Sequence, residues 1–103
     1  MGYALFKVSD ADGHLAMTEV TERPLMRHHL DTNDCFILDT PQQIYVWIGK
    51  AATVQEKKNS MLYASEYKVK QNKAKNTKVS RIPEKTEDSY FKSFFDGFYP
   101  AIK

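Results

Sequence analysis

The sequence is poor in the residues that disulfide frameworks, membrane spans and most active sites require. It has a single cysteine, Cys35, so no disulfide can form within the chain. No apolar run approaches the ~20 residues that span a bilayer, so we expect no transmembrane segment. Three histidines and one cysteine are too few for a zinc site or a nucleophile triad, and no glycine-rich phosphate loop or serine elbow occurs. These absences argue against an enzyme.

What the chain does contain is typical of one small globular domain. Its 103 residues are 42% hydrophobic and 27% charged, so we expect residues 1–103 to form a single domain. Cys35 stands directly before three apolar residues, which favours a buried, inert thiol. A lone, unpaired thiol of this kind also favours a reducing compartment.

Apolar patterns along the chain predict five strands and two helices. The strands are expected at residues 3–9, 15–20, 34–39, 43–48 and 77–82, and the helices at residues 53–71 and 87–96. The third and fourth strands are apolar on successive residues, as expected for strands covered on both faces. The order β-β-β-β-α-β-α predicts an α+β fold, in which a five-stranded mixed sheet lies between one long and one short helix.

The long helix has a clear start and more than one apolar face. Thr53 and Glu56 form a capping box, with Thr53 as the N-cap. The residues that share the expected core face are Ser60, Ala64 and Tyr67. The apolar residues that fall outside this face are Met61, Leu62 and Val69. This second face is a candidate for docking a partner, although isolated exposed apolar residues are also common.

The end of the chain predicts a strand followed by a short aromatic helix. Pro83 is expected to stop the fifth strand and Thr86 to cap the helix that follows. The aromatic residues Phe91, Phe94, Phe95 and Phe98 recur at helical spacing. We interpret them as one face packed into the core.

Two acids could be brought together by this arrangement. Asp34 stands where a strand begins, Glu56 lies in the first turn of the long helix, and Asn33 offers a backbone carbonyl beside Asp34. Ca²⁺ takes six to eight oxygen ligands, and separate elements can supply them. The capping box alone also explains Glu56, and a strand end alone explains Asp34. A calcium site and a structural role therefore both stay open.

The charge is distributed unevenly. Six cations and no acid occur between residues 68 and 81, namely Lys68, Lys70, Lys73, Lys75, Lys78 and Arg81. The net charge of the whole chain is +2, so the rest of the chain is acidic. A basic segment of this kind suits an acidic protein surface or anionic lipid, and it is also compatible with a solvated helix end. No aromatic residue is interleaved with these cations, so we expect no nucleic-acid partner.

Several segments together resemble a known family. They are residues 30–39 (LDTNDCFILD), residues 44–50 (IYVWIGK) and residues 56–57 at the start of the long helix. Residues 5–9 also resemble the first strand of such domains, and residues 91–95 resemble their last helix. Nearly the whole chain is covered by this resemblance to a gelsolin-homology domain of the gelsolin/villin/severin group, and the opening residues look like those of a third or sixth repeat.

The resemblance implies a cytoplasmic, actin-associated protein that severs, caps or bundles filaments under calcium control. By the family pattern, Ca²⁺ would be held by the Asn33 carbonyl, the Asp34 side chain and the Glu56 side chain. Asn33 stands where the family often has glycine, and the remaining ligand would lie near or beyond the end of the domain. The long helix would dock in an actin cleft, with Met61, Leu62 and Val69 as anchors.

The resemblance also leaves other functions open. Neighbouring repeats would be partners if this domain is part of a longer chain. The domain could serve as a metal-free spacer between active repeats. It could also respond to phosphoinositides through the six cations between residues 68 and 81.

Overall fold

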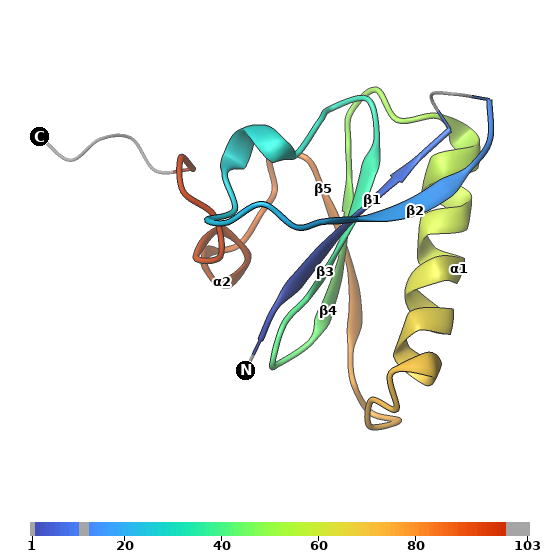
Figure 1. Cartoon of the computed structure of the whole chain (residues 1–103), viewed down its shortest axis with the longest axis vertical. Helices are drawn as coiled ribbons and strands as arrows, with labels where there is room; N and C mark the ends of the chain where they lie inside the picture. Colours follow the sequence, from blue (N-terminus) through green and yellow to red (C-terminus); the bar gives the residue numbers. More distant parts are fainter. Residues whose placement is uncertain (1, 11–12, 99–103) are drawn as a thin grey trace, which may run out of the picture.

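The computed structural model describes residues 2–10 and 13–98 as one sheet flanked by helices (Figure 1). The strands are β1 (Ala4–Ser9), β2 (Ala16–Val20), β3 (Cys35–Asp39), β4 (Ile44–Ile48) and β5 (Val79–Pro83). The helices are α1 (Val54–Lys70), α2 (Ser89–Lys92) and the short 3₁₀ turn η1 (Arg27–His29). The expected order of strands and helices is therefore confirmed.

The five strands form one mixed sheet in the order β2-β1-β3-β4-β5. The pairs β1–β2, β1–β3 and β3–β4 are antiparallel, and only β4 and β5 run parallel. A parallel pair needs a crossover connection, and α1 supplies it between β4 and β5. β3 and β4 lie inside the sheet and are buried along their whole length, as their continuous apolar sequences predict.

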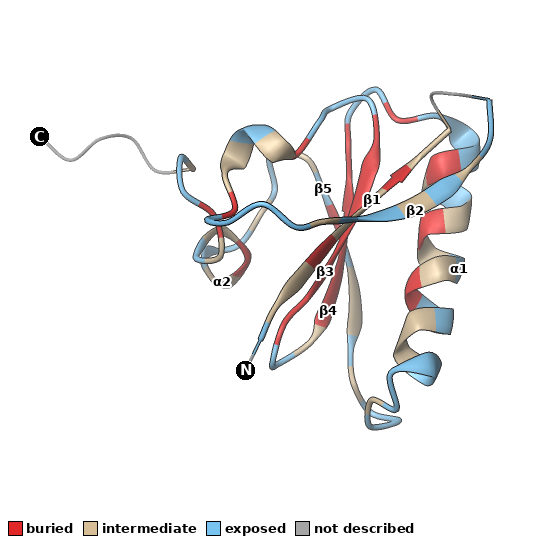
Figure 2. Cartoon of the chain, viewed as in Figure 1, coloured by how far each residue is buried: buried red, intermediate tan, exposed pale blue. Residues whose placement is uncertain are grey.

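Two apolar cores lie on the two faces of this sheet. On one face, Ala64 of α1 packs over Val8, Ile37 and Val46. On the other, Phe91 and Phe95 pack with strand residues that include Phe36 and Trp47. Figure 2 shows the central strands buried between the long helix on one side and the α2 segment on the other. The predicted sheet between two helical layers is thus confirmed.

The start of α1 and its buried face agree with the sequence patterns. Thr53 is the N-cap, and its hydroxyl accepts a hydrogen bond from the Glu56 backbone amide at 3.1 Å. The residues of α1 that are buried against the sheet are Glu56, Ser60 and Ala64, one face of the helix. Ser60 and Ala64 are small, which lets the helix axis approach the strands closely.

The second helix is shorter than its sequence pattern suggests. It covers only Ser89–Lys92, and its N-cap is Asp88, whose carboxylate accepts from the Phe91 amide at 2.8 Å. The Thr86 hydroxyl instead donates to the Pro83 carbonyl at 2.7 Å and closes a turn. The expected cap at Thr86 and the expected end at residue 96 are therefore wrong.

The early end of α2 has a tertiary cause. The Asp96 amide donates to the Leu25 carbonyl at 2.9 Å, and the Asp96 carbonyl accepts from the Arg27 amide at 2.7 Å. These bonds to the segment before β3 replace the next helical turn. Phe91 and Phe95 are nevertheless buried, and Phe94 and Phe98 pack against the same core, so the predicted aromatic face is confirmed.

The strand boundaries differ from the expected ones by one or two residues. β5 begins at Val79 because the Thr77 amide is used in a turn, where it donates to the Ala74 carbonyl at 2.9 Å. Pro83 was expected to stop this strand but is its last residue, paired with Ile48. A proline is tolerated there because β5 is an edge strand. In the described part of the chain, no helix has the length and apolarity needed to cross a membrane.

Candidate cation site and helix surface

The loop before β3 holds Asp34 in a buried position. The Asp31 carboxylate accepts from the Asn33 amide at 2.9 Å, and the Asp34 amide donates to the Asp31 carbonyl at 3.0 Å. This tight turn is of the kind that aspartate side chains favour. Asp34 is only 4% exposed, whereas Asn33 beside it lies on the surface.

Gly49 packs directly against this loop from the end of β4. Its amide donates to the Asp34 carbonyl at 3.1 Å, and the Ala51 amide donates to the Thr32 carbonyl at 2.9 Å. A Cβ atom at residue 49 would lie far inside van der Waals contact of the Asp34 and Thr32 carbonyl oxygens. The glycine after β4 is therefore required because the two backbones approach so closely.

Glu56 is buried at the other side of the same site. It is 1% exposed, and each carboxylate oxygen accepts one backbone amide. Thr53 N donates to Oε1 at 2.8 Å, and Asp10 N donates to Oε2 at 3.0 Å. The first bond completes the capping box, and the second ties α1 to the end of β1. A carboxylate oxygen has about two acceptor positions, so both oxygens can still accept another ligand.

Asp34 and Glu56 are brought together, as the sequence hypothesis required. Burial raises the pKa of Glu56, and the contact with the Asp34 carboxylate raises it further, while the amides of Thr53 and Asp10 act in the opposite direction. One cation is close by, because Lys7 Nζ lies 3.6 Å from Asp34 Oδ2. Of the two buried carboxylates, Asp34 is thus paired with an ammonium group, which is itself partly exposed.

The oxygen ligands at this point suit a hard cation. Carboxylate and carbonyl oxygens are the ligands that Ca²⁺ takes. The Thr32 and Asp34 carbonyls are used in backbone hydrogen bonds, whereas none of the backbone bonds among the described residues ends on the Asn33 carbonyl. Within residues 2–10 and 13–98, no group of three or more His, Cys, Asp or Glu side chains is arranged to hold a metal ion. Carbonyls or ligands from elsewhere would have to complete a site.

A second buried carboxylate lies at the opposite end of β3. Tyr67 donates its hydroxyl to Asp39 Oδ2 at 2.7 Å, and Lys73 Nζ lies 2.8 Å from Asp39 Oδ1. The contact between Lys73 and Asp39 is an ion pair, but the ammonium is not oriented to form a hydrogen bond with Asp39 Oδ1. Burial, followed by the contact with Asp39, raises the pKa of the Tyr67 phenol. The sequence patterns did not suggest this cluster, because its residues are far apart along the chain and share no motif.

The three predicted anchors on α1 do not share one surface. Leu62 is 52% exposed and Val69 is 76% exposed, so both are accessible. Met61 is partly buried and packs against the core beneath α1. α1 thus carries three exposed large apolar side chains, Val54, Leu62 and Val69, and Met61 is available only in part.

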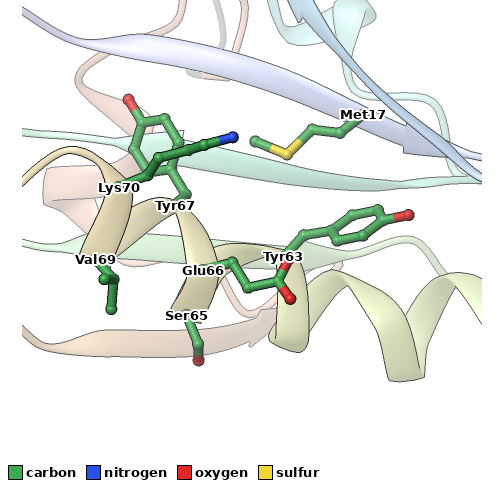
Figure 3. A pocket seen from close by; sticks show the side chains of 7 residues that line it. All are labelled: Met17, Tyr63, Ser65, Glu66, Tyr67, Val69 and Lys70. Carbon is green, nitrogen blue, oxygen red and sulfur yellow. The ribbon is translucent and has the colours of Figure 1, made fainter.

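An open groove runs along α1 beside β2 (Figure 3). Its volume is about 680 Å³, and Met17 reaches over it from β2 while the other lining residues belong to α1. Its lining residues are Met17, Tyr63, Ser65, Glu66, Tyr67, Val69 and Lys70. The exposed Val69 therefore lies at the edge of an apolar surface rather than alone.

The basic segment is divided by its internal contacts. Lys73 pairs with Asp39, and Lys68 Nζ donates to the Lys75 carbonyl at 2.8 Å. The cations that lie exposed are Lys70, Lys75, Lys78 and Arg81. The role of this segment in binding anionic lipid stays a prediction, but Lys73 already has a carboxylate partner within the chain.

Comparisons with known proteins agree with the signature segments. The gelsolin repeat family model matches residues 16–92. Gelsolin of Drosophila melanogaster is 43% identical over 98 residues, covering 95% of this chain and 12% of that protein. Advillin of Mus musculus is 39% identical over 92 residues, covering 88% of this chain and 11% of that protein. This chain thus spans only about one eighth of the length of these relatives.

The fold has counterparts among solved structures. A chain of the Thorarchaeota 2DGel3/rabbit actin complex superposes with a TM-score of 0.77 at 27% identity, over 90% of this chain and 45% of that chain. A chain of the Thorarchaeota ProGel/rabbit actin complex has a TM-score of 0.73 at 19% identity, which shows a shared fold alone. Given these likenesses and the match over residues 16–92, the chain belongs to the gelsolin repeat family.

Proposed function

We propose that this domain is a calcium-binding actin-regulatory repeat, in which Ca²⁺ joins the start of β3 to the start of α1. The observation that carries the proposal is the contact between two buried carboxylates, Asp34 and Glu56, for which the described residues supply one ion-paired ammonium, that of Lys7 on Asp34. Burying two carboxylates together is unfavourable unless a cation compensates their charge or one of them keeps a proton, and Ca²⁺ would displace such a proton. The backbone carbonyl of Asn33, in the loop directly before β3, would be a further ligand of the ion.

In this proposal the ion supplies the positive charge that the two carboxylates lack. Asp34 would bind from the sheet and Glu56 from the helix, while the Thr53 and Asp10 amides keep the Glu56 carboxylate in place. The start of α1 would therefore be fixed more firmly against the sheet. In a protein with several repeats, this change could shift the balance between a closed and an open arrangement of neighbouring repeats.

Actin is the partner that fits the family and the helix surface. The chain from the 2DGel3 complex, which resembles this one, was solved with rabbit actin. Leu62 and Val69 leave an exposed apolar face on α1, which is the form in which a helix docks into a groove. Because the chain spans a small part of its relatives, severing and capping would belong to the whole protein, which we expect to be cytoplasmic.

The calcium part of the proposal is tested by isothermal titration with Ca²⁺. We expect the wild type to bind one ion and Glu56→Gln to bind it at least tenfold more weakly, because the charge is lost while the shape is kept. Glutamine can still accept the Thr53 amide, so the capping box should survive. If the wild type binds no calcium, the metal-free spacer function becomes the better account.

The actin part is tested by co-sedimentation of a double variant, Leu62→Glu with Val69→Glu. Both side chains are exposed, so the fold should be kept and the affinity for actin should fall at least tenfold. Val54→Glu is a matched control, because Val54 is 78% exposed at the far end of the same helix. Unchanged binding by the double variant would rule out this face as the docking surface.

Binding of anionic lipid is a second candidate. It is favoured by four exposed cations, of which Lys70, Lys75 and Lys78 lie between the end of α1 and the start of β5, and Arg81 lies in the middle of β5. Binding to phosphoinositide vesicles should then weaken steeply between 0.05 and 0.5 M salt, on the order of tenfold or more. Binding that ignores salt, or no binding at all, would exclude this function.

A further inference from the structure

We infer that Lys7 is an intramolecular competitor of calcium at the Asp34–Glu56 site, so that this side chain sets how much calcium the repeat requires. The inference rests on the proposed calcium function and adds a control to the same site. Its starting point is that Lys7 Nζ lies 3.6 Å from Asp34 Oδ2. An ammonium and a metal ion that use the same carboxylate weaken each other's binding.

The position of Lys7 on β1 directs it to this acid. Lys7 is opposite Phe36 and Val8 is opposite Cys35 in the antiparallel β1–β3 ladder. Asp34 therefore lies just beyond the last pair of the ladder, within reach of the Lys7 side chain. The contact arises from strand register, so it is a fixed feature of the sheet rather than a chance meeting of two loops.

The two partners differ in their access to water. The Asp34 side chain is 6% exposed, whereas the Lys7 side chain is 41% exposed. The carboxylate is fixed in the site, while the long lysine side chain can turn its ammonium into solvent. If the Lys7 ammonium turned away, it would be hydrated, whereas the Asp34 carboxylate would stay buried without its counter-ion. A divalent ion arriving at Asp34 can thus displace Lys7 at small cost.

The charges of the site make Lys7 its resident counter-ion. Within the described residues, no other ion pair ends on Asp34 or Glu56. Lys7 therefore stabilises the metal-free state, and it opposes the metal-bound state because it repels a second cation. Both effects lower the apparent affinity for calcium. Partly exposed ion pairs are weak, so we expect removal of Lys7 to tighten the Kd for Ca²⁺ by about fivefold.

A purely structural role for Lys7 predicts something different. If the side chain merely holds Asp34 in place, its loss should disorder the acid and weaken calcium binding. If the pair is an unimportant surface contact, its loss should change neither the affinity nor the stability. Only if Lys7 competes with calcium should its loss both destabilise the metal-free domain and tighten the binding of the ion.

The test uses Lys7→Met and Lys7→Gln, which keep most of the side-chain length without the charge. Calcium affinity is measured by isothermal titration, and thermal stability is measured in EDTA and in saturating calcium. Both variants should bind Ca²⁺ about fivefold more tightly than the wild type. Both should melt lower than the wild type in EDTA, and that deficit should disappear or reverse in calcium. If one of the two variants fails to fold, the other still gives the calcium affinity without the Lys7 charge.

Lys78→Met is the matched control. Lys78 is exposed, and its backbone carbonyl accepts from the Ile44 amide at the far end of the sheet. The substitution changes the net charge by the same amount without touching the site. Its calcium affinity should stay within about twofold of the wild type, because exposed charges at that distance are largely screened. An equal gain in both lysine variants would overturn the inference in favour of a general charge effect.

The outcomes separate this inference from the proposed function. Calcium binding that depends on Glu56 but is unchanged or weaker in the Lys7 variants overturns the competitor role and leaves the calcium site intact. Absence of binding in the wild type and in both Lys7 variants overturns both. Binding that becomes measurable only when Lys7 is replaced supports the competitor role directly.

Discussion

The two ends of β3 carry buried carboxylates with opposite surroundings. Asp34, just before the strand, contacts a second carboxylate and a partly exposed ammonium. Asp39, the last residue of the strand, contacts a tyrosine hydroxyl and the Lys73 ammonium. In Figure 1 the start of β3 and of α1 lie at the upper end of the molecule, and their other ends lie below. At the lower end the Tyr67 hydroxyl ties the helix to Asp39, and at the upper end the Asp10 amide ties it to the end of β1 through Glu56.

The difference shows what separates a candidate ion site from a structural tether. At the Asp39 end the chain supplies its own donor and its own positive charge, so nothing further is needed. At the Asp34 end two acids meet, and the described residues supply one ion-paired ammonium, that of Lys7 on Asp34. An excess of buried negative charge raises the free energy of the metal-free fold, and an external cation would lower it. The two ends of β3 should therefore respond differently to substitution and to calcium.

The largest effect is expected from Gly49→Ala, which acts on the Asp34 end. The new Cβ atom would clash with two backbone carbonyls that cannot turn aside, those of Thr32 and Asp34. We expect a loss of about 3 kcal/mol in the free energy of unfolding, measured by urea denaturation. Gly2→Ala is the control, because nothing lies near its Cβ position, and it should cost under about 0.5 kcal/mol. A mild Gly49→Ala variant would mean that the loop before β3 is not tightly held.

A smaller loss is expected from Asp39→Asn at the other end. The amide can still accept the Tyr67 hydroxyl, but the ion pair with Lys73 is removed. Because Lys73 is partly exposed and can turn to water, the cost should be about 2 kcal/mol rather than that of a fully buried pair. Chemical denaturation gives the value, and Lys73→Met should cost no more. A neutral or stabilising Asp39→Asn would show that this end, too, carries uncompensated charge.

Tyr67→Phe should have the mildest effect, about 1 kcal/mol near neutral pH, because one hydrogen bond to Asp39 is lost. Its pH dependence is more telling. Folding raises the pKa of the Tyr67 phenol, chiefly through burial, so the folded state keeps a proton that the unfolded state releases. The stability it contributes is complete below pH about 10 and is lost as the pH rises toward the folded pKa.

Thermal melts between pH 8 and pH 11 test this prediction for Tyr67. The wild type should lose stability more steeply than Tyr67→Phe above pH about 10. Tyr45 is present in both proteins, and burial, followed by Asp88, raises its pKa to about 12, so its contribution cancels in the comparison. Parallel curves for the two proteins would contradict the raised pKa of the buried Tyr67 phenol.

Much of the fold could be predicted because its signals are local. The capping box fixes the start of α1, and the continuous apolar runs fix β3 and β4. The end of α2 could not be predicted, because it depends on hydrogen bonds of Asp96 to residues about 70 positions earlier in the chain. The sheet between two helices followed from the order of the apolar patterns, and the family followed from the signature segments. Membership of the gelsolin repeat family, matched over residues 16–92, agrees with the prediction that the domain is not an enzyme.

Some residues of the candidate site could also be predicted from local sequence signals, and others could not. Asp34 and Glu56 could be proposed together because the signature segments contain both. The roles of Lys7 and of the Asp39 cluster could not be predicted. The contact of Lys7 depends on the register of β1 and β3, and the contact of Asp39 with Lys73 depends on the path of the loop after α1. The same limit explains why Lys73, which belongs to a basic segment in the sequence, is found paired with a buried acid. Residues whose role is set by distant partners carry no local signal.

We propose that calcium binds at the Asp34 end of β3 and not at the Asp39 end. The most direct test is the calcium-dependent change in thermal stability of the wild type and of two matched variants, Asp34→Asn and Asp39→Asn. At a free calcium concentration about 100 times the Kd, binding should stabilise the wild type by about 2.7 kcal/mol. Asp39→Asn should melt lower but gain the same increment, while Asp34→Asn should gain almost none. An equal increment in all three proteins, or none in the wild type, would contradict the claim.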